Sequence, residues 1–440
     1  MTGSIKRFRL VIGTVVIYLI ALSYFFILQF ASGIMIQDPE NYFHLKMAEL
    51  IAAGGLVRNF PWIGYGVLSG SHYTDHEFLF HLLVAPFTRF DSFALAQWAG
   101  VFLPSLVPAT LYWVIARRRL PVPAFWALSF LAAGFSTVER FMHLRAYTLS
   151  VPLSLLTLDA VIDGKRRRAF LLSFLHAWIY LLSGVGVFLA AVFYAVRRLR
   201  GEGISFKIVL ACAAGWAGGL ILHPYFPYSL TKIYPRILPA AASVWSGINL
   251  DQGMENLPLT TQLYALDLGY VPILAGGLLF LMLFCRKTIS STALALLTIG
   301  GLFFAGSCMS RRVVEYAVPL TLYACAFCAD DLGGQGPWRN AWRWRSRRMI
   351  AVVLLSVAVI GYGTVTYQRI RDNRLKARPT AALEAGAWLK AHTEAGDLVF
   401  NCAWDDFGAL FYSSSQNRYL TGLEPAYFYA DRPELYRQWD

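Results

Sequence analysis

The sequence is poor in charged residues, and this scarcity excludes a soluble globular protein. Only 15% of its 440 residues are Asp, Glu, Lys or Arg, whereas soluble domains carry about 25%. Hydrophobic residues make up 57%, and the mean hydropathy is +0.49. The chain therefore cannot be a soluble enzyme, and we expect it to lie in a membrane.

Other scarce features remove further function classes. The six cysteines form no disulfide pattern, because five lie in or beside apolar blocks and Cys402 stands alone. Cys325 and Cys328 have the spacing of a redox or metal pair, but within an apolar helix we interpret them as small packing residues. There is no glycine-rich phosphate loop, and the +13 net charge gathers beside apolar blocks, so nucleic-acid binding is not expected.

Long apolar blocks take up most of the chain. A bilayer core needs about 20 residues of helix, and the block Phe8–Gly33 has no charge after Arg9. It is too long for a signal peptide and has no small-residue cleavage site, so we expect a retained anchor. The further blocks are Phe93–Ala116, Pro123–Phe135, Tyr147–Ile162, Phe170–Val196, Ile208–Leu222, Val271–Cys285, Ser290–Cys308, Val313–Cys328 and Ile350–Thr366.

The positions of the basic clusters predict the topology, because lysine and arginine in short loops favour the cytoplasmic side. If all six basic clusters lie on the cytoplasmic side, the N-terminus is inside the cell and the residues after Thr366 are outside. This arrangement also requires a hairpin in Phe170–Val196, turning near Ser183, Gly184 and Gly186, and an interfacial stretch at Glu77–Phe87. The clusters are Lys6–Arg9, Arg117–Arg119, Lys165–Arg168, Arg197–Arg200, Arg286–Lys287 and Arg339–Arg348.

The predicted fold is an all-α polytopic membrane protein with about eleven membrane helices. Residues 1–366 form this membrane domain, in which residues 34–92 are the first outer loop. Residues 367–440 form a small extracytoplasmic α/β segment, with a helix at Thr380–His392 and a strand at Asp397–Asn401. Because this segment offers little core of its own, we expect it either to be incomplete or to pack against the membrane part.

The first outer loop carries the most specific local pattern. Asp38 followed by Pro39 is typical of a helix start, and Gly54-Gly55 of a helix end. Phe43, Met47, Leu50 and Ile51 form an apolar stripe on this helix, with Glu40, His44 and Glu49 largely off it. The stripe predicts a helix that lies along the membrane surface.

Two acidic clusters approach the outer membrane boundary, one at Asp38 and one at Asp75-His76-Glu77. The carboxylates of Asp38, Asp75 and Glu77 are the hard ligands that magnesium or manganese prefers, so a divalent cation is one hypothesis and no cofactor the other. Asp38 either acts chemically or only caps its helix. His44, His76 and His81 are interpreted as interfacial hydrogen-bonding residues unless a substrate engages them.

Arginines also occur on the outer side, where the insertion bias disfavours them. Arg140 and Arg145 lie in one predicted outer turn, and Arg311 and Arg312 in another. One interpretation is that they anchor the chain at the interface. The other is that they converge on a lipid-linked phosphate and bind it through bidentate guanidinium contacts.

Together these stretches carry a family resemblance. A first membrane helix followed by Asp-Pro-Glu-Asn-Tyr-Phe-His (38–44), an amphipathic helix and then Asp75-His76-Glu77 resembles the C-type glycosyltransferase superfamily. Its members include protein O-mannosyltransferases, aminoarabinose transferases and oligosaccharyltransferase catalytic subunits. The Trp-Trp-Asp motif of oligosaccharyltransferases is absent, so transfer to asparagine is not expected.

The resemblance implies roles for individual residues. Asp38 matches the catalytic base, and Asp75 or Glu77 matches the second acidic position of the family. Arg311 or Arg312, beside Glu315 and Tyr316, resembles the arginine that holds the donor phosphate. Arg140, Arg145 and His44 join them as candidate substrate-binding residues.

The implied activity is inverting transfer of a sugar from a polyprenyl-phosphate carrier to a lipid, glycan or protein acceptor. It would take place on the outer face of a bacterial inner membrane, among membrane lipids. A polytopic transporter or lipid flippase of envelope precursors is the alternative, and it should show ionisable groups at mid-membrane and inverted repeats. The candidate residues gather at one face and the sequence shows no repeat, which favours the enzyme.

Overall fold

The computed structural model describes residues 2–439, except 31–37, 91, 182–183, 234–267, 269, 285, 335–341 and 377–379. Most of the predicted outer loop His223–Gly269 therefore lies outside the described residues. The same holds for Ser183 of the predicted hairpin turn and for the start of the basic cluster Arg339–Arg348.

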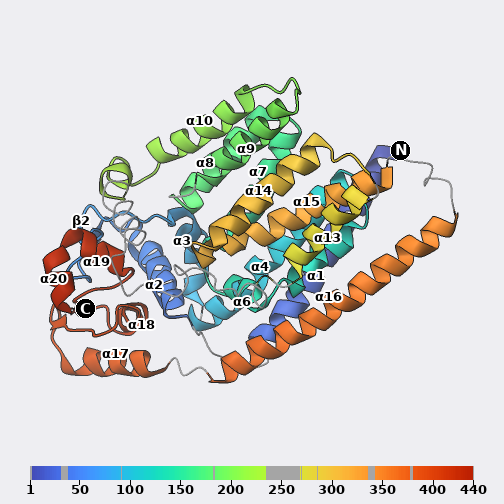
Figure 1. Cartoon of the computed structure of the whole chain (residues 1–440). Helices are drawn as coiled ribbons and strands as arrows, with labels where there is room; N and C mark the ends of the chain where they lie inside the picture. The colour runs from blue at the N-terminus through green and yellow to red at the C-terminus, as the bar shows by residue number, and fades with distance from the viewer. Residues whose placement is uncertain are drawn as a thin grey trace.

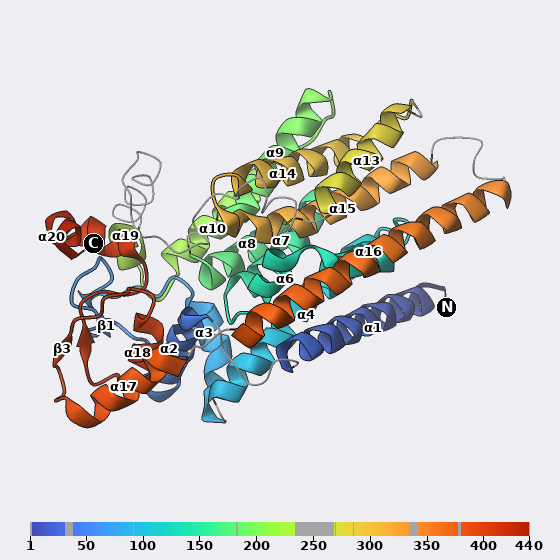
Figure 2. The ribbon, with the colours of Figure 1, turned by 60° about the horizontal axis from the view of Figure 1, so that its bottom comes forward.

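Long helices form a bundle, with the N-terminus at the end opposite the C-terminal segment (Figures 1 and 2). The first and fourth helices run side by side along it. The helices of the bundle are α1 (Thr2–Phe30), α4 (Ser92–Arg117), α5 (Pro123–Ser129), α6 (Phe135–Phe141), α7 (Tyr147–Ile162), α8 (Arg166–Ile179), α9 (Val185–Leu199), α10 (Lys207–Ile221), α13 (Val271–Phe284), α14 (Ser291–Ser307), α15 (Val314–Gly334) and α16 (Trp342–Lys376), with 3-10 turns η2 (Phe130–Ala132) and η4 (Arg311–Val313).

The helices confirm that the apolar blocks are helical. Among the residues that the structure describes, three segments are long and apolar enough to cross a bilayer, namely Arg7–Phe30, Ala94–Arg117 and Arg311–Gly333, and there are also shorter apolar helices of 10–17 residues. The predicted hairpin is present as α8 and α9, with Gly184 directly before α9. The block Pro123–Phe135 is helical as α5 followed by η2, and the chain bends at Gly134, whose φ is +111°, near the predicted end of the block. The count of about eleven spans stays a prediction.

Charged residues join the helices at the end of the bundle far from the C-terminal segment. Asp159 on α7 is fully buried and accepts hydrogen bonds from Arg117, the last residue of α4, and from Arg118 directly after it, at 2.6 and 2.9 Å. Asp163 pairs with Arg118 and with Lys165. These contacts bring two of the basic clusters to the same end, as the topology requires. Which side of the membrane that end faces stays a prediction.

The other end of the bundle carries the first loop and the C-terminal segment (Figure 2). The two-residue strands pair as β1 with β2, antiparallel, and as β3 with β4, parallel. The elements are α2 (Pro39–Gly54), β1 (Asn59–Phe60), β2 (Gly70–Ser71), α3 (Phe78–Val84), η1 (Ala85–Arg89), η3 (Ser229–Ile233), α17 (Thr380–His392), β3 (Leu398–Val399), α18 (Phe407–Ser413), β4 (Arg418–Tyr419), α19 (Pro425–Asp431) and α20 (Pro433–Trp439).

Helix α2 begins and ends as predicted, but its environment differs from the prediction. Asp38 caps it, its Oδ1 accepting from the backbone N–H of Glu40 at 3.0 Å, and Gly55 ends it with φ +78°. Phe43 and Met47 pack into a core with α18, while Tyr42 and Leu45 pack into a second core with α3 and α4. The helix is therefore buried by protein on two sides, and its apolar stripe contacts side chains of this chain.

The C-terminal segment shares that core with the first loop. The ring of Phe411 is fully buried, 5.5 Å from Phe60 and 4.9 Å from Trp62. The backbone of Ile63 also forms a β-bridge with Tyr419 of β4. The segment thus packs against the first loop, which is one of the two outcomes expected from its small core. Its helix α17 has the predicted bounds, whereas the predicted strand is reduced to Leu398–Val399.

Candidate active site

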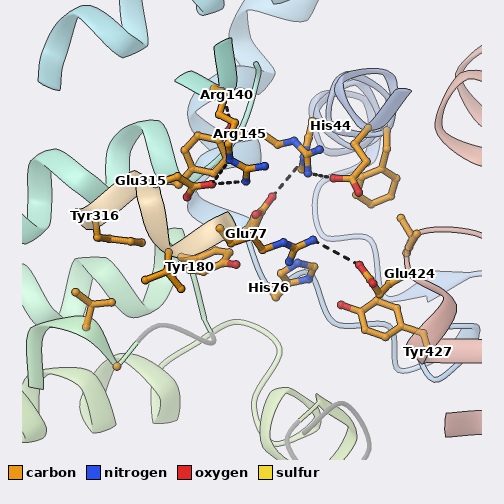
Figure 3. Close-up of a pocket in the computed structure, with 18 of the residues that line it drawn as sticks. His44, His76, Glu77, Arg140, Arg145, Tyr180, Glu315, Tyr316, Glu424 and Tyr427 are labelled. Carbon is orange, nitrogen blue, oxygen red and sulfur yellow. Dashed lines mark hydrogen bonds and ion pairs between the residues drawn. The ribbon is translucent and has the colours of Figure 1, made fainter. Parts of the chain in front are cut away.

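A cavity of about 340 Å³ lies where the bundle meets the first loop and the C-terminal segment. Figure 3 shows acidic and basic side chains facing one another across it. Four carboxylates and three guanidinium groups belong to its wall, together with tyrosine and histidine side chains. The lining residues are Glu40, Phe43, His44, His76, Glu77, Arg140, Arg145, Tyr147, Tyr180, Gly184, Val185, Phe303, Arg312, Val313, Glu315, Tyr316, Leu423, Glu424 and Tyr427.

Two backbone contacts place the turn that carries Arg140 and Arg145. The backbone N–H of Leu144 donates to Oδ1 of Asn41 on α2, at 2.8 Å. On the other side, α4 approaches so closely at Gly100 that a Cβ there would lie 2.4 Å from the Met142 carbonyl oxygen. Only glycine permits this approach without a shift of the backbone, so α4 sets the position of the two arginines.

Arg140 is held by Glu315 at the start of α15. Its Nε donates to Oε1 of Glu315 at 2.9 Å, and its Nη2 contacts the same oxygen. The guanidinium also lies 5.4 Å from the ring centre of Tyr147, as a cation–π contact. Because Glu315 is buried, this pair is a fixed part of the wall.

Arg145 joins the turn to the beginning of α2. Its Nη2 and Nε donate to Oδ2 of Asp38, at 2.6 and 3.2 Å, and its Nη1 contacts Glu40. Asp38 does not line the cavity, and its carboxylate lies behind the guanidinium that does. The predicted base and one predicted phosphate ligand are therefore direct neighbours.

Arg312 and Arg311 point to different surroundings. Arg312 lines the cavity and its Nη2 lies 3.5 Å from Oε2 of Glu424, which directly precedes α19. Arg311 is not among the lining residues, and its buried Nε has no hydrogen-bond partner within the described part of the chain. Of the two alternatives that the sequence left open, the structure brings Arg312 to the cavity.

The second acidic cluster forms a buried hydrogen-bonded group with two histidines. Oδ2 of Asp75 lies 2.7 Å from Nδ1 of His81, and Nε2 of His81 lies 2.8 Å from Nδ1 of His44. Oδ1 of Asp75 accepts from the backbone N–H of Glu77 at 2.9 Å, and Oε2 of Glu77 lies 3.3 Å from the same His44 nitrogen. His44 and Glu77 line the cavity, while Asp75 lies behind them.

Burial and charge move the pKa values in this group in opposite directions. Burial lowers the pKa of His44 to about 3, so its imidazole is neutral at pH 7. Burial would also lower the pKa of His81, but the Asp75 carboxylate outweighs it and holds that pKa above its ordinary value. Burial alone would raise the pKa of Asp75, yet His81 keeps it below the usual range. His44 and His81 form hydrogen bonds, as the simpler prediction has it, and both are buried within this chain.

The side chains that could share a cation differ from the predicted set. Within the described residues, His44, Glu77 and His81 offer ligand atoms that all lie within 4.8 Å of one another. Asp38, Asp75 and Glu77 do not form such a group, because Arg145 holds Asp38 and His81 holds Asp75. Only Glu77 is common to both sets.

Several wall residues were given no role of their own from the sequence. Tyr316 is placed by Ser150, whose Oγ is 2.6 Å from its hydroxyl and also contacts His176. Glu424 and Tyr427 come from the far end of the chain, where the only local signal is Pro425 at a helix start. Nothing in that signal indicates a cavity, so these residues could not have been found without the tertiary structure.

No family model matches the sequence, and no curated protein matches it. The fold, however, is similar to solved structures of two enzymes. The oligosaccharyltransferase AglB of Archaeoglobus fulgidus, in complex with an inhibitory peptide and a dolichol-phosphate, matches 93% of this chain with a TM-score of 0.64 and 12% identity. ArnT of Cupriavidus metallidurans, bound to undecaprenyl phosphate, matches 91% with a TM-score of 0.56 and 15% identity.

The matched regions make up 64% of AglB and 84% of ArnT, so this chain spans less than two thirds of the AglB length. At such low identity the likeness concerns the fold. It shows that this chain has a fold similar to those of AglB and ArnT. Together with the three spanning segments, it also supports an integral membrane protein.

Proposed function

We propose that this protein is a membrane glycosyltransferase that takes a sugar from a polyprenyl-phosphate carrier and transfers it to an acceptor hydroxyl on the extracytoplasmic face of a bacterial inner membrane. The observation that carries the proposal is the cavity, where Arg140, Arg145 and Arg312 meet the acidic residues of the first loop. The fold around it is that of two enzymes whose solved structures hold a dolichol-phosphate or undecaprenyl phosphate.

The arginines suit the donor phosphate because guanidinium groups bind phosphate oxygens bidentately. Each now contacts a carboxylate, and the contacts differ in strength. Arg140 makes two contacts to buried Glu315, whereas Arg312 makes a 3.5 Å contact to Glu424 with its side chain 36% exposed. Exchange of a carboxylate for phosphate is therefore easiest at Arg312, so we assign it the first contact with the donor.

The proposed reaction is a single inverting displacement. The acceptor oxygen attacks the anomeric carbon, the bond from that carbon to the phosphate oxygen breaks, and the polyprenyl phosphate leaves with the electron pair. Asp38 takes the acceptor proton once Arg145 has turned to the phosphate. The arginines stabilise the charge that grows on the leaving phosphate, an interaction that is strongest in the transition state.

The C-terminal segment supplies the part of the wall that lies beside the first loop. Leu423, Glu424 and Tyr427 belong to it, and the backbone of Val67 in the first loop donates to the Tyr427 carbonyl at 3.2 Å. We therefore assign the acceptor side of the cavity to this segment. Neither the sugar nor the acceptor class, whether lipid, glycan or protein, follows from these contacts.

The test is sugar transfer by purified protein in liposomes that contain labelled polyprenyl-phosphate sugars, with products identified by mass spectrometry. Arg312→Ala should lower transfer by about tenfold or more, the loss expected for one charge-assisted contact to phosphate. Arg312→Lys should recover part of it, because lysine keeps the charge but not the planar fork. Arg311→Ala is the matched control and should remain near wild type, since Arg311 does not line the cavity.

Two results would oppose the proposal. Full activity of Arg312→Ala would remove this residue from the donor site. Movement of intact lipid-linked sugar across the bilayer, with no covalent product, would instead support the transporter or flippase.

A further inference from the structure

Three ligand-type atoms converge beside the cavity, on side chains that are each less than 10% exposed. Nδ1 of His44 lies 2.8 Å from Nε2 of His81 and 3.3 Å from Oε2 of Glu77. They come from α2, from α3 and from the residue that directly precedes α3, so two helices hold them.

Asp75 directs two of these three side chains. Its Oδ2 accepts from Nδ1–H of His81, which leaves the Nε2 lone pair of that ring facing His44. Its Oδ1 accepts from the backbone N–H of Glu77. A carboxylate that receives the outer N–H of a histidine is the usual second layer of a metal site, because it fixes the ring and makes the inner nitrogen more basic.

We propose that His44, Glu77 and His81 bind one divalent transition-metal ion of the zinc class. His81 and Glu77 present lone pairs to the same point, and His44 can do so as well in its neutral form. Because the three ligand atoms lie within 4.8 Å of one another, one cation can contact all of them. Two imidazole nitrogens favour zinc or cobalt over magnesium, which prefers oxygen ligands alone.

The three ligands also place the ion at the edge of the cavity, where it could contact a bound donor. Three protein ligands leave an open coordination position, and His44 and Glu77 both line the cavity. Four carboxylates face three guanidinium groups there, and a phosphate-bearing donor would add further negative charge. An ion at this edge would offset that excess and offer a position to a phosphate oxygen. This role rests on the proposed function, but binding of the ion does not.

The experiment measures metal on the full chain, purified in detergent. The protein is stripped with a chelator, incubated separately with zinc, cobalt, manganese and magnesium salts, and desalted. Bound metal is counted by elemental mass spectrometry, and the cobalt form is examined by visible absorption. We expect one zinc or cobalt ion per chain, cobalt bands typical of four or five ligands, and little retained magnesium.

Variants show whether the ion sits in the proposed place. His81→Ala and His44→Ala should lose the ion, and Asp75→Asn should weaken binding by about 10- to 100-fold, as outer-layer changes do. His392→Ala removes an exposed imidazole on α17 and should keep full occupancy. Size-exclusion profiles identify any variant that does not fold, and the wild-type count and cobalt spectrum do not depend on variants.

Wild-type protein that retains none of the four ions would overturn the site and leave a metal-free Asp75–His81–His44 hydrogen-bonded chain. Full occupancy in both histidine variants, or retention of magnesium alone, would overturn it too. Sugar transfer is measured on the same samples. A bound ion with no transfer leaves the site standing and contradicts the transferase. Transfer by wild-type protein that retains no ion after incubation leaves the transferase standing and contradicts the site.

Discussion

The substitution Asp38→Asn separates the two jobs that the structure gives this carboxylate. Oδ1 of Asp38 caps α2 by accepting from Glu40 N–H at 3.0 Å, while Oδ2 accepts two hydrogen bonds from Arg145. Asparagine keeps an oxygen for the cap. It replaces the other oxygen by an NH₂ group that faces a guanidinium, so the ion pair is lost and the variant cannot accept a proton at neutral pH.

The stability cost can be bounded from the same contacts. Hydrogen bonds to charged groups contribute about 1.5–3 kcal/mol, and both side chains are largely shielded, with 17% and 11% exposed. Arg145 keeps its contact to Glu40, so we expect Asp38→Asn to lower the free energy of unfolding by about 2 kcal/mol. Asp38→Ala also removes the cap and should cost about 1 kcal/mol more.

The effect on turnover should be larger. If Asp38 is the base, Asp38→Asn should lose about a hundredfold or more in kcat, the scale typical of general-base catalysis. Glu40→Gln is the matched control, because Glu40 also pairs with Arg145 and lies on the same turn. If the loss came only from freeing Arg145, the two variants should be similarly impaired.

The assay is transfer of labelled sugar by the purified variants in liposomes at saturating donor, with thermal unfolding measured on the same samples. Near-wild-type turnover of Asp38→Asn would refute the assignment of the base. Asp75 or Glu77 would then be the next candidate.

Other substitutions test the framework around the site. Gly100→Val should lower sugar transfer, because its Cβ would lie 2.4 Å from the Met142 carbonyl oxygen and displace it. Gly301→Val is the control: its Cβ meets no atom within 4 Å, so transfer should stay at the wild-type rate. Phe411→Ala should lower the free energy of unfolding by about 3–5 kcal/mol, because the ring is fully buried. Limited proteolysis of the C-terminal segment should then be faster, and an unchanged rate would contradict this packing. A topology reporter at Gly336 should be active inside and one after Thr366 outside; the reverse would overturn the orientation.

Elements whose signals are local were predictable. The bounds of α7, α2 and α17 follow from apolar run length and from the Asp38, Pro39 and Gly55 end signals, and the structure has them where the sequence places them. The likeness to a glycosyltransferase fold was also readable, because a few short stretches and the order of the blocks carry it. The short helix α6, which follows the bend at Gly134, was not predicted, because seven residues with two charges carry no long apolar run.

The sequence by itself determined that this is a helical membrane protein and which polar residues lie at one end of its blocks. Only the tertiary structure decided their partners. It set Arg312 rather than Arg311 in the cavity, joined Arg145 to Asp38, buried His44 against His81, and brought Glu424 from the far end of the chain to the site. The physical reason is that run length and helix-end signals act within a few residues, whereas these contacts join residues that are 37 to 112 positions apart. No local pattern records which of those residues meet.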